Sequence, residues 1–134
     1  MKQLSVFLEN KTGRINELAK TLGKAGINMM AFSMAETSDF GILRLIVSDV
    51  DKAVEVLRSN SFAVTVTEVV CISCTNVAGA LSGVLEQLAK NDIFIEYMYA
   101  FSENDSAHVV ILPNNIEKCV ATLKECNCEI KENF

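Results

Sequence analysis

Apolar and polar residues alternate with two periodicities along the first half of the chain, one typical of strands and one typical of helices. Between Leu4 and Leu8 every second residue is aliphatic, which is typical of a strand with one buried face. From Ile15 to Ala25 the apolar residues recur at helical spacing, and Gly26 is suited to end that helix. The same analysis predicts strands at 27–35, 41–47 and 62–66. Between the last two strands it predicts a helix whose apolar face consists of Val50, Ala53, Val54 and Leu57. Ser48 and Asp49 can cap this helix.

The second half repeats this pattern without a gap at an offset of 66 residues, as from Gly13 to Gly79. A unit of about 60 residues can just bury its own core, so each copy is a whole small domain. We therefore predict two domains, 1–67 and 68–134. The second has strands expected at 70–75, 93–101, 107–112 and 128–131, and helices at 79–91 and 117–125.

The order strand, helix, strand, strand, helix, strand within about 65 residues is that of the ferredoxin-like βαββαβ fold. It predicts an α+β protein in which each domain has an antiparallel four-stranded sheet with both helices on one face. We expect the two sheets to join into a larger sheet, either within the chain or through a homodimer, because exposed sheet edges favour pairing.

Charge narrows the possible partners. The net charge is −5, and Lys and Arg are not clustered, which argues against nucleic acid or an anionic membrane as a main partner. The chain contains no apolar run of 18 residues and no charged-then-apolar start typical of a signal peptide. We therefore expect a cytoplasmic protein.

All five cysteines belong to the second copy, and free, mostly buried thiols are the simplest interpretation. Cys71-x-x-Cys74 with Cys126-x-Cys128 offers the alternative of a zinc site. Residues three apart on a strand point to opposite faces, however, so we expect no metal site. His108 occupies a strand position that corresponds to Ile42, and we expect it to pack on the sheet face and to take no part in catalysis.

Candidate binding chemistry gathers where the first strand meets the first helix. A helix start offers unpaired backbone N–H groups, and Gly13 lets a ligand approach the backbone closely. Lys11 and Arg14 add positive charge there, which suits a carboxylate or phosphate, although both could simply be solvated surface residues. Asn28, at the head of an apolar strand, can both donate and accept hydrogen bonds; its alternative role is in the turn.

The chain carries no recognisable catalytic set. It lacks a Gly-rich phosphate loop and a Gly-x-Ser-x-Gly motif, and it has one histidine. The carboxylates on the predicted helices are spaced as solvated surface groups, namely Glu17, Glu55, Glu86 and Glu117. We expect no catalysis and no cofactor. An acylphosphatase-like hydrolase, which would need Arg14 and Asn28 in one site, remains an alternative, as do a metal-handling module and a purely structural interaction domain.

The segment Glu9-Asn10-Lys11-Thr12-Gly13-Arg14-Ile15, followed by Gly26-Ile27-Asn28-Met29, resembles the ACT domain, and both copies share the resemblance. It implies a βαββαβ fold and a regulatory module of amino-acid metabolism that binds an amino acid or similar effector. In that family, domains pair edge to edge through their second strands, and the ligand lies between the first loop of one domain and the second strand of the other.

Carried over residue by residue, the resemblance implies two sets of ligand-binding positions. The first set is Asn10, Lys11, Thr12, Gly13, Arg14, Ile15, Asn28 and Met29, and the second is Asn76, Val77, Ala78, Gly79, Ala80, Leu81, Phe94 and Ile95. The family's proline before the glycine is Thr12 here, which can cap the helix, and Ala78 in the second copy. Because Phe94 replaces the asparagine and the second loop has no cation, we expect inequivalent sites.

With no catalytic domain in its sequence, the chain is similar to stand-alone tandem ACT proteins. The resemblance therefore implies a sensor that reports effector level to a separate enzyme or pathway. Met29, Met30, Phe94 and Ile95 favour an effector with an apolar, aromatic or imidazole side chain, although core packing explains these residues equally well.

Overall fold

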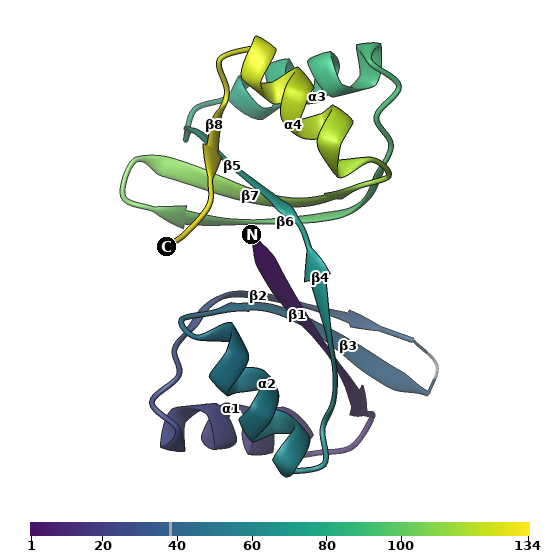
Figure 1. Ribbon diagram of the computed structural model, residues 1–134, viewed down its shortest axis with the longest axis vertical. Helices are drawn as coiled ribbons and strands as arrows, with labels where there is room; N and C mark the ends of the chain where they lie inside the picture. Colours follow the sequence, from purple (N-terminus) through teal and green to yellow (C-terminus); the bar gives the residue numbers. More distant parts are fainter. Residues whose placement is uncertain (38) are drawn as a thin grey trace. The chain divides into compact units, whose positions relative to one another are not determined.

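The computed structural model describes residues 1–37 and 39–134, which divide into two compact units. Lys2–Thr67 form the first domain, and Glu68–Phe134 form the second, with which Met1 is grouped. The first contains β1 (Lys2–Glu9), α1 (Arg14–Lys24), β2 (Met29–Glu36), β3 (Phe40–Val47), α2 (Val50–Ser59) and β4 (Ala63–Glu68) (Figure 1). The second contains β5 (Val70–Thr75), α3 (Ala80–Lys90), β6 (Ile95–Glu103), β7 (Ser106–Pro113), α4 (Ile116–Glu125) and β8 (Glu129–Lys131).

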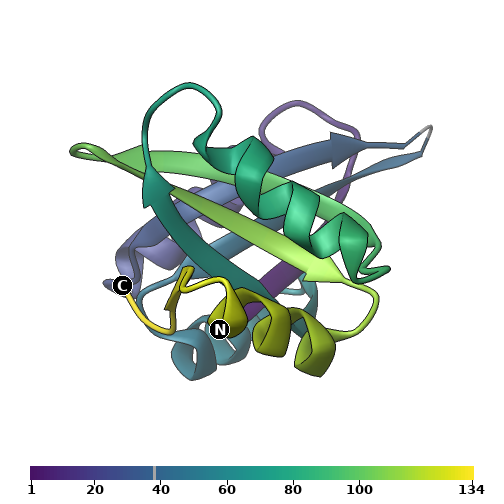
Figure 2. The same cartoon turned by 90° about the horizontal axis from the view of Figure 1, so that it is seen from above.

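Each domain is a four-stranded antiparallel sheet covered on one face by its two helices, as predicted. The strand order is β2-β3-β1-β4 in the first domain and β6-β7-β5-β8 in the second. Figure 2 shows α3 and α4 lying across the second sheet. The strands form two four-stranded ladders, and the joining of the two sheets, within the chain or through a homodimer, stays a prediction.

The alternation of side chains explains the core of each domain. In the first sheet Leu4 lies opposite Leu45 and Val6 opposite Leu43, so both strands present aliphatic side chains to the helices. The corresponding pairs in the second sheet are Val70 with Ile111 and Ile72 with Val109. The helices complete the two cores with aliphatic residues at equivalent positions, namely Leu22 and Leu57 in the first and Leu88 and Leu123 in the second.

The helix starts repeat between the domains and correct one expectation. Gly13 and Gly79 are the N-caps of α1 and α3, with φ of 89° and 87°, and neither helix has a side-chain cap. Thr12 therefore does not cap α1, contrary to our expectation. At α2 the Asp49 side chain accepts a hydrogen bond from the Lys52 N–H at 3.1 Å, and Asn115 does the same at α4.

Among the described residues, no helix has the length and apolar character needed to cross a membrane.

Candidate functional site

The first loop lines a small pocket in the first domain, which we call the loop pocket. It encloses about 290 Å³ between the end of β1, the start of α1 and the end of β2. Its lining residues are Leu8, Glu9, Asn10, Lys11, Thr12, Arg14, Ile15, Met34 and Glu36. The pocket thus brings together five of the six loop residues that the sequence singled out, and Gly13 lies in the same loop.

Hydrogen bonds hold the loop in a defined shape. The Asn10 side-chain amide donates to the Thr37 carbonyl at 3.2 Å, which ties the loop to the turn after β2. The Lys11 N–H donates to the Glu9 carbonyl at 2.8 Å, and Gly13 supplies the left-handed conformation before α1. The shared Asn-x-x-Gly spacing therefore has a structural role at Asn10 and Gly13 as well as any role in binding.

The electrostatics of the loop suit an anion. No side chain caps α1, the Arg14 N–H donates to the Lys11 carbonyl at a long 3.4 Å, and the helix start carries partial positive charge. The Lys11 ammonium lies 3.2 Å from the Glu9 carboxylate, and both side chains are exposed. Exposed ion pairs contribute little to stability, so a ligand carboxylate can replace Glu9 as the partner of Lys11 at low cost.

Arg14 lines the loop pocket but is already engaged in packing. Its guanidinium carbon lies 4.1 Å from the centre of the Phe62 ring, and Nη1 lies 2.7 Å from the Glu17 carboxylate. The side chain is 15% exposed, so Arg14 is not the solvated surface residue of our alternative interpretation. Its buried Nε has no hydrogen-bond partner within the described part of the chain.

Asn28 is exposed and lies at the opposite end of β2 from the loop pocket. Its N–H donates to the Ser48 hydroxyl at 2.9 Å, while its side-chain amide contacts the Met30 sulfur at 3.3 Å. The turn is therefore held through the backbone, and the side chain is not needed for it. The structure does not bring Asn28 or Met29 into the loop pocket, nor Arg14 and Asn28 together as an acylphosphatase-like site requires.

The predicted second-copy positions fall into exposed and packed groups. Val77 and Phe94 are 61% and 67% exposed, while Leu81 and Ile95 pack against the second core. The Phe94 N–H donates to the Asn114 side chain at 3.1 Å, in the same way that the Asn28 N–H donates to Ser48. Of the remaining positions, Asn76, Ala78 and Gly79 are exposed in the loop, and Ala80 lines a different pocket.

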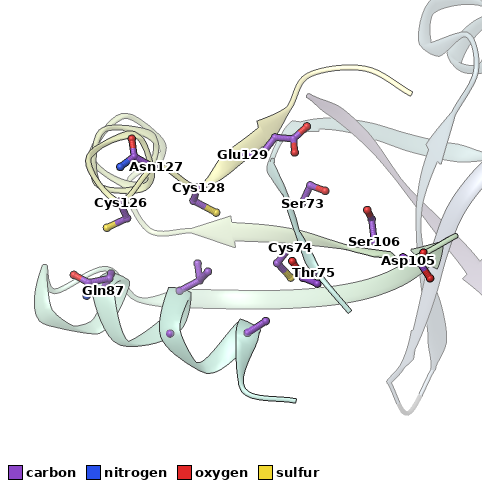
Figure 3. Close-up of a pocket in the computed structure, with 13 residues that line it drawn as sticks. Ser73, Cys74, Thr75, Gln87, Asp105, Ser106, Cys126, Asn127, Cys128 and Glu129 are labelled. Atoms are coloured by element: carbon purple, nitrogen blue, oxygen red, sulfur yellow. The ribbon is translucent and has the colours of Figure 1, made fainter. Parts of the chain in front are cut away.

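That second pocket, which we call the thiol groove, encloses about 870 Å³ between α3, β5 and the start of β8 (Figure 3). Its lining includes three cysteines, Cys74, Cys126 and Cys128, together with the small residues Ala80 and Gly83. Sequence analysis did not identify this groove, because small residues on a helix give no pattern of their own.

The cysteines are all free and lie in different surroundings. Cys74 packs on the helix side of β5, whereas Cys71, three residues earlier, points to the other face, as the strand pattern predicts. Burial raises the pKa of the Cys71 and Cys119 thiols to about 11. No group of three or more metal-ligating side chains capable of holding a metal ion occurs among the described residues.

His108 packs on the sheet face in the second domain. It is 4% exposed, and its ring centre lies 5.0 Å from that of Phe101 and 6.0 Å from that of Phe134. Its Nε2 lies 3.7 Å from a carboxylate oxygen of Glu103. This environment agrees with the expected role as a sheet-face residue.

Sequence analysis missed Met34 and Glu36, which form the β2 side of the loop pocket. The methyl end of Met34 occupies the space where a side chain at Gly41 would lie. The glycine in an otherwise apolar β3 was the available signal, since a glycine inside a strand often marks such a close approach.

Comparison with known proteins identifies the family. A family model described as an ACT domain pair matches residues 1–132. The chain is 54% identical to protein BT0572 from Bacteroides thetaiotaomicron over 97% of this chain and 90% of that one, with a TM-score of 0.94. No curated protein matches.

Two further solved structures share the fold at low sequence identity. The ligand-free regulatory subunit of aspartate kinase from Thermus thermophilus is 14% identical, with a TM-score of 0.72 and coverage of 94% of this chain and 90% of that one. The corresponding subunit from Thermus flavus is 13% identical, with a TM-score of 0.66 and coverage of 94% and 92%. On the match across both repeats, the chain belongs to the ACT domain pair family.

Proposed function

We propose that this protein is a non-catalytic sensor that binds an amino acid or a similar small effector and regulates a separate enzyme of amino-acid metabolism. The effector binds where the loop pocket of the first domain meets the second strand of another ACT domain. The observation that carries this proposal is the position of the loop pocket beside Met34 and Glu36, at the far end of an edge strand.

The geometry of β2 explains how two separated groups of predicted residues can form one site. Asn28 and Met29 lie at the start of β2, and Glu36 at its end borders the loop pocket. When two β2 strands pair antiparallel, the start of one lies beside the end of the other. A second copy paired in this way therefore brings its Asn28 next to the loop pocket of the first, which supports a homodimer.

The side chains of β2 also favour such pairing. Phe32 and Met34 are 62% and 44% exposed, although they lie opposite the core residues Leu45 and Leu43 of β3. Large apolar side chains left exposed on an edge strand are typical of a surface that associates. Pairing through β2 would cover these side chains and complete the backbone hydrogen bonding of the edge.

The residues around the proposed site fit a zwitterion. Lys11 and the start of α1, which no side chain caps, can hold a carboxylate, and the Glu9 and Glu36 carboxylates can accept hydrogen bonds from an ammonium group. Ile15, which is 45% exposed, and Met34 offer apolar surface to the effector side chain. The fold shared with regulatory subunits of aspartate kinase further supports a subunit that acts on a separate enzyme.

A thermal-shift screen against the twenty amino acids tests the proposal. An effector that binds the native state raises the melting temperature, so one amino acid or a small related group should do so at millimolar concentration. Lys11→Ala and Asn28→Ala should abolish that shift without lowering the melting temperature of the free protein, because both side chains are exposed.

Phe94→Ala is the matched control, since Phe94 occupies the position of Asn28 in the second domain. If the effector binds at the first-domain site, Phe94→Ala should leave the effector-induced rise in melting temperature unchanged. A screen in which no amino acid changes the melting temperature would contradict the amino-acid effector. A shift that survives both Lys11→Ala and Asn28→Ala would place the effector elsewhere.

A further inference from the structure

Three of the five thiols open into the thiol groove. Cys74 comes from β5, Cys126 directly follows α4, and Cys128 directly precedes β8. Figure 3 shows Cys74 and Cys128 on neighbouring segments, with Cys126 farther along at the end of the helix. The groove belongs to the second domain alone and is separate from the loop pocket.

The β5–β8 ladder ends one residue before Cys74 on one strand and one residue after Cys128 on the other. β5 and β8 pair antiparallel through Cys71 with Lys131, Ile72 with Ile130, and Ser73 with Glu129. Continuing this register by one residue beyond the ladder would set Cys74 opposite Cys128, and both side chains pack against the same helix-side cluster. Directly opposed residues have Cβ atoms about 4.5–5.5 Å apart. A disulfide needs about 3.5–4.5 Å, so a small movement closes the pair.

The neighbouring thiols also affect the pKa of Cys128. Burial raises the pKa of the Cys128 thiol, and the neighbouring Cys74 and Cys126 thiols raise it further, as does Glu129. Such an influence requires the sulfur atoms to be near one another, which agrees with the register.

Access to solvent distinguishes this pair from the other buried thiols. In the first domain, the positions of Cys74 and Cys128 are Leu8 and Phe62, which are 1% and 5% exposed, and Arg14 lies over Phe62. In the second domain Ala80 takes the place of Arg14 and leaves the thiols open to the groove. Cys119, in contrast, is completely buried in the second core.

We propose that Cys74 and Cys128 are a redox modification site, at which hydrogen peroxide converts the two thiols into a disulfide. One thiolate attacks the peroxide, the O–O bond breaks, and a sulfenic acid forms while water leaves. The second thiol displaces the sulfenic oxygen as a second water molecule and the S–S bond forms. Two thiols are thereby oxidised, and one peroxide is reduced to two waters. A thiol reductant reverses the modification.

The disulfide would extend the pairing between β5 and β8, because β8 has only three residues and its ladder ends at Ser73. Linking Cys74 to Cys128 fixes the segment between α4 and β8 and narrows the thiol groove. This inference does not depend on effector binding in the first domain.

The test uses the full-length protein treated with hydrogen peroxide, followed by alkylation and peptide mass spectrometry. We expect a peptide pair linked through Cys74 and Cys128, a loss of two hydrogen atoms, and three cysteines that remain alkylated. Dithiothreitol should restore five alkylated cysteines. Amide hydrogen exchange in β8 should slow several-fold in the oxidised form, because the cross-link restrains local opening.

Three single variants identify the pair. Cys126→Ser should still form the linked peptide, whereas Cys74→Ser and Cys128→Ala should not. Circular dichroism verifies that each variant is folded. A link between Cys126 and either other thiol in the unmodified sequence, or oxidation of single cysteines without any cross-link, would overturn the proposal.

Discussion

Between the first helix of each domain and the adjacent edge strand, one domain holds a stacked arginine and phenylalanine, and the other has a wider groove. In the first domain Arg14 stacks on Phe62 and pairs with Glu17, and the pocket beside them encloses about 500 Å³ without reaching β1. In the second domain Ala80, Cys128 and Gly83 occupy these positions, and the groove encloses about 870 Å³ and extends to β5.

This difference shows which parts of a duplicated fold must be kept. Both domains have the same backbone hydrogen bond after their second helix. The Phe62 N–H donates to the Leu57 carbonyl and the Cys128 N–H to the Leu123 carbonyl, both at 3.0 Å. The side chains that pack near these backbone bonds differ between the two domains at every position compared above. Backbone geometry and the aliphatic core define the fold, while the helix-to-edge space is free to diverge toward packing or toward an accessible groove.

Removing the aromatic ring of Phe62 should lower the free energy of unfolding more than any other change considered. Phe62→Ala deletes a side chain that is 5% exposed in the first core, and such changes cost about 3–5 kcal/mol in the free energy of unfolding. Cys128→Ala, at the half-buried equivalent position, should cost about 1 kcal/mol. Urea unfolding followed by circular dichroism measures both. Equal losses would contradict the difference in packing.

Removing the guanidinium of Arg14 should give the second largest loss in the free energy of unfolding. Arg14→Ala loses the stacking on Phe62 and the packing of the side-chain stem, and we expect a loss of about 2 kcal/mol. Lys11→Ala is the control, because that side chain is exposed and should change stability by less than about 0.5 kcal/mol. If Arg14→Ala is as harmless as Lys11→Ala, the Arg14–Phe62 contact is not a stabilising one.

Alkaline pH should destabilise the second domain, which contains all the cysteines. Burial raises the pKa of Cys119 from 9.0 to about 11, so between these values the unfolded state has lost a proton that the folded state keeps. Stability therefore falls as pH rises through this window, by about 1 kcal/mol for each such thiol near pH 10.

Hydrogen exchange resolved by peptide should show this loss in the second domain and not in the first. The double variant Cys71→Ala with Cys119→Ala removes both thiols whose pKa is raised to about 11 and should flatten the pH dependence. A pH slope that persists in this variant would assign the effect to other groups.

Replacing Gly83, the glycine of α3 that lines the thiol groove, should give the smallest change in stability, and this change should be an increase. A methyl group added at Gly83 would meet no neighbouring side chain within 4 Å, so Gly83→Ala gains helix propensity of about 1 kcal/mol. Gly79→Ala, four residues earlier, should instead destabilise by about 1–2 kcal/mol because Gly79 has φ of 87°. Melting temperatures that shift in the same direction for both would contradict this distinction.

Much of the fold could be predicted because its signals are local. The alternation at Leu4, Val6 and Leu8 and the helical spacing at Leu18 and Leu22 each depend on neighbours within a few residues. The left-handed Gly26, with φ of 72°, was predicted as the end of the first helix on the same basis. The Thr12 cap failed because the glycine itself takes the N-cap position.

The candidate site was harder to predict because its parts are distant in sequence. The loop was identified, but its contacts with Met34 and Glu36 follow from strand order and register. Arg14 was interpreted as a binding cation or a surface residue, and neither interpretation included Phe62, which lies 48 positions away.

The sequence by itself determined the duplication, the βαββαβ order, the aliphatic cores and the loop at residues 10–15, because periodicity and glycine conformation are properties of short segments. Only the tertiary structure decided that Arg14 packs on Phe62, that Asn28 lies at the opposite end of β2 from the loop pocket, and that Cys74 and Cys128 line one groove. These relations depend on which strands become neighbours and in what register, and the free energy that selects them comes from the whole packed core.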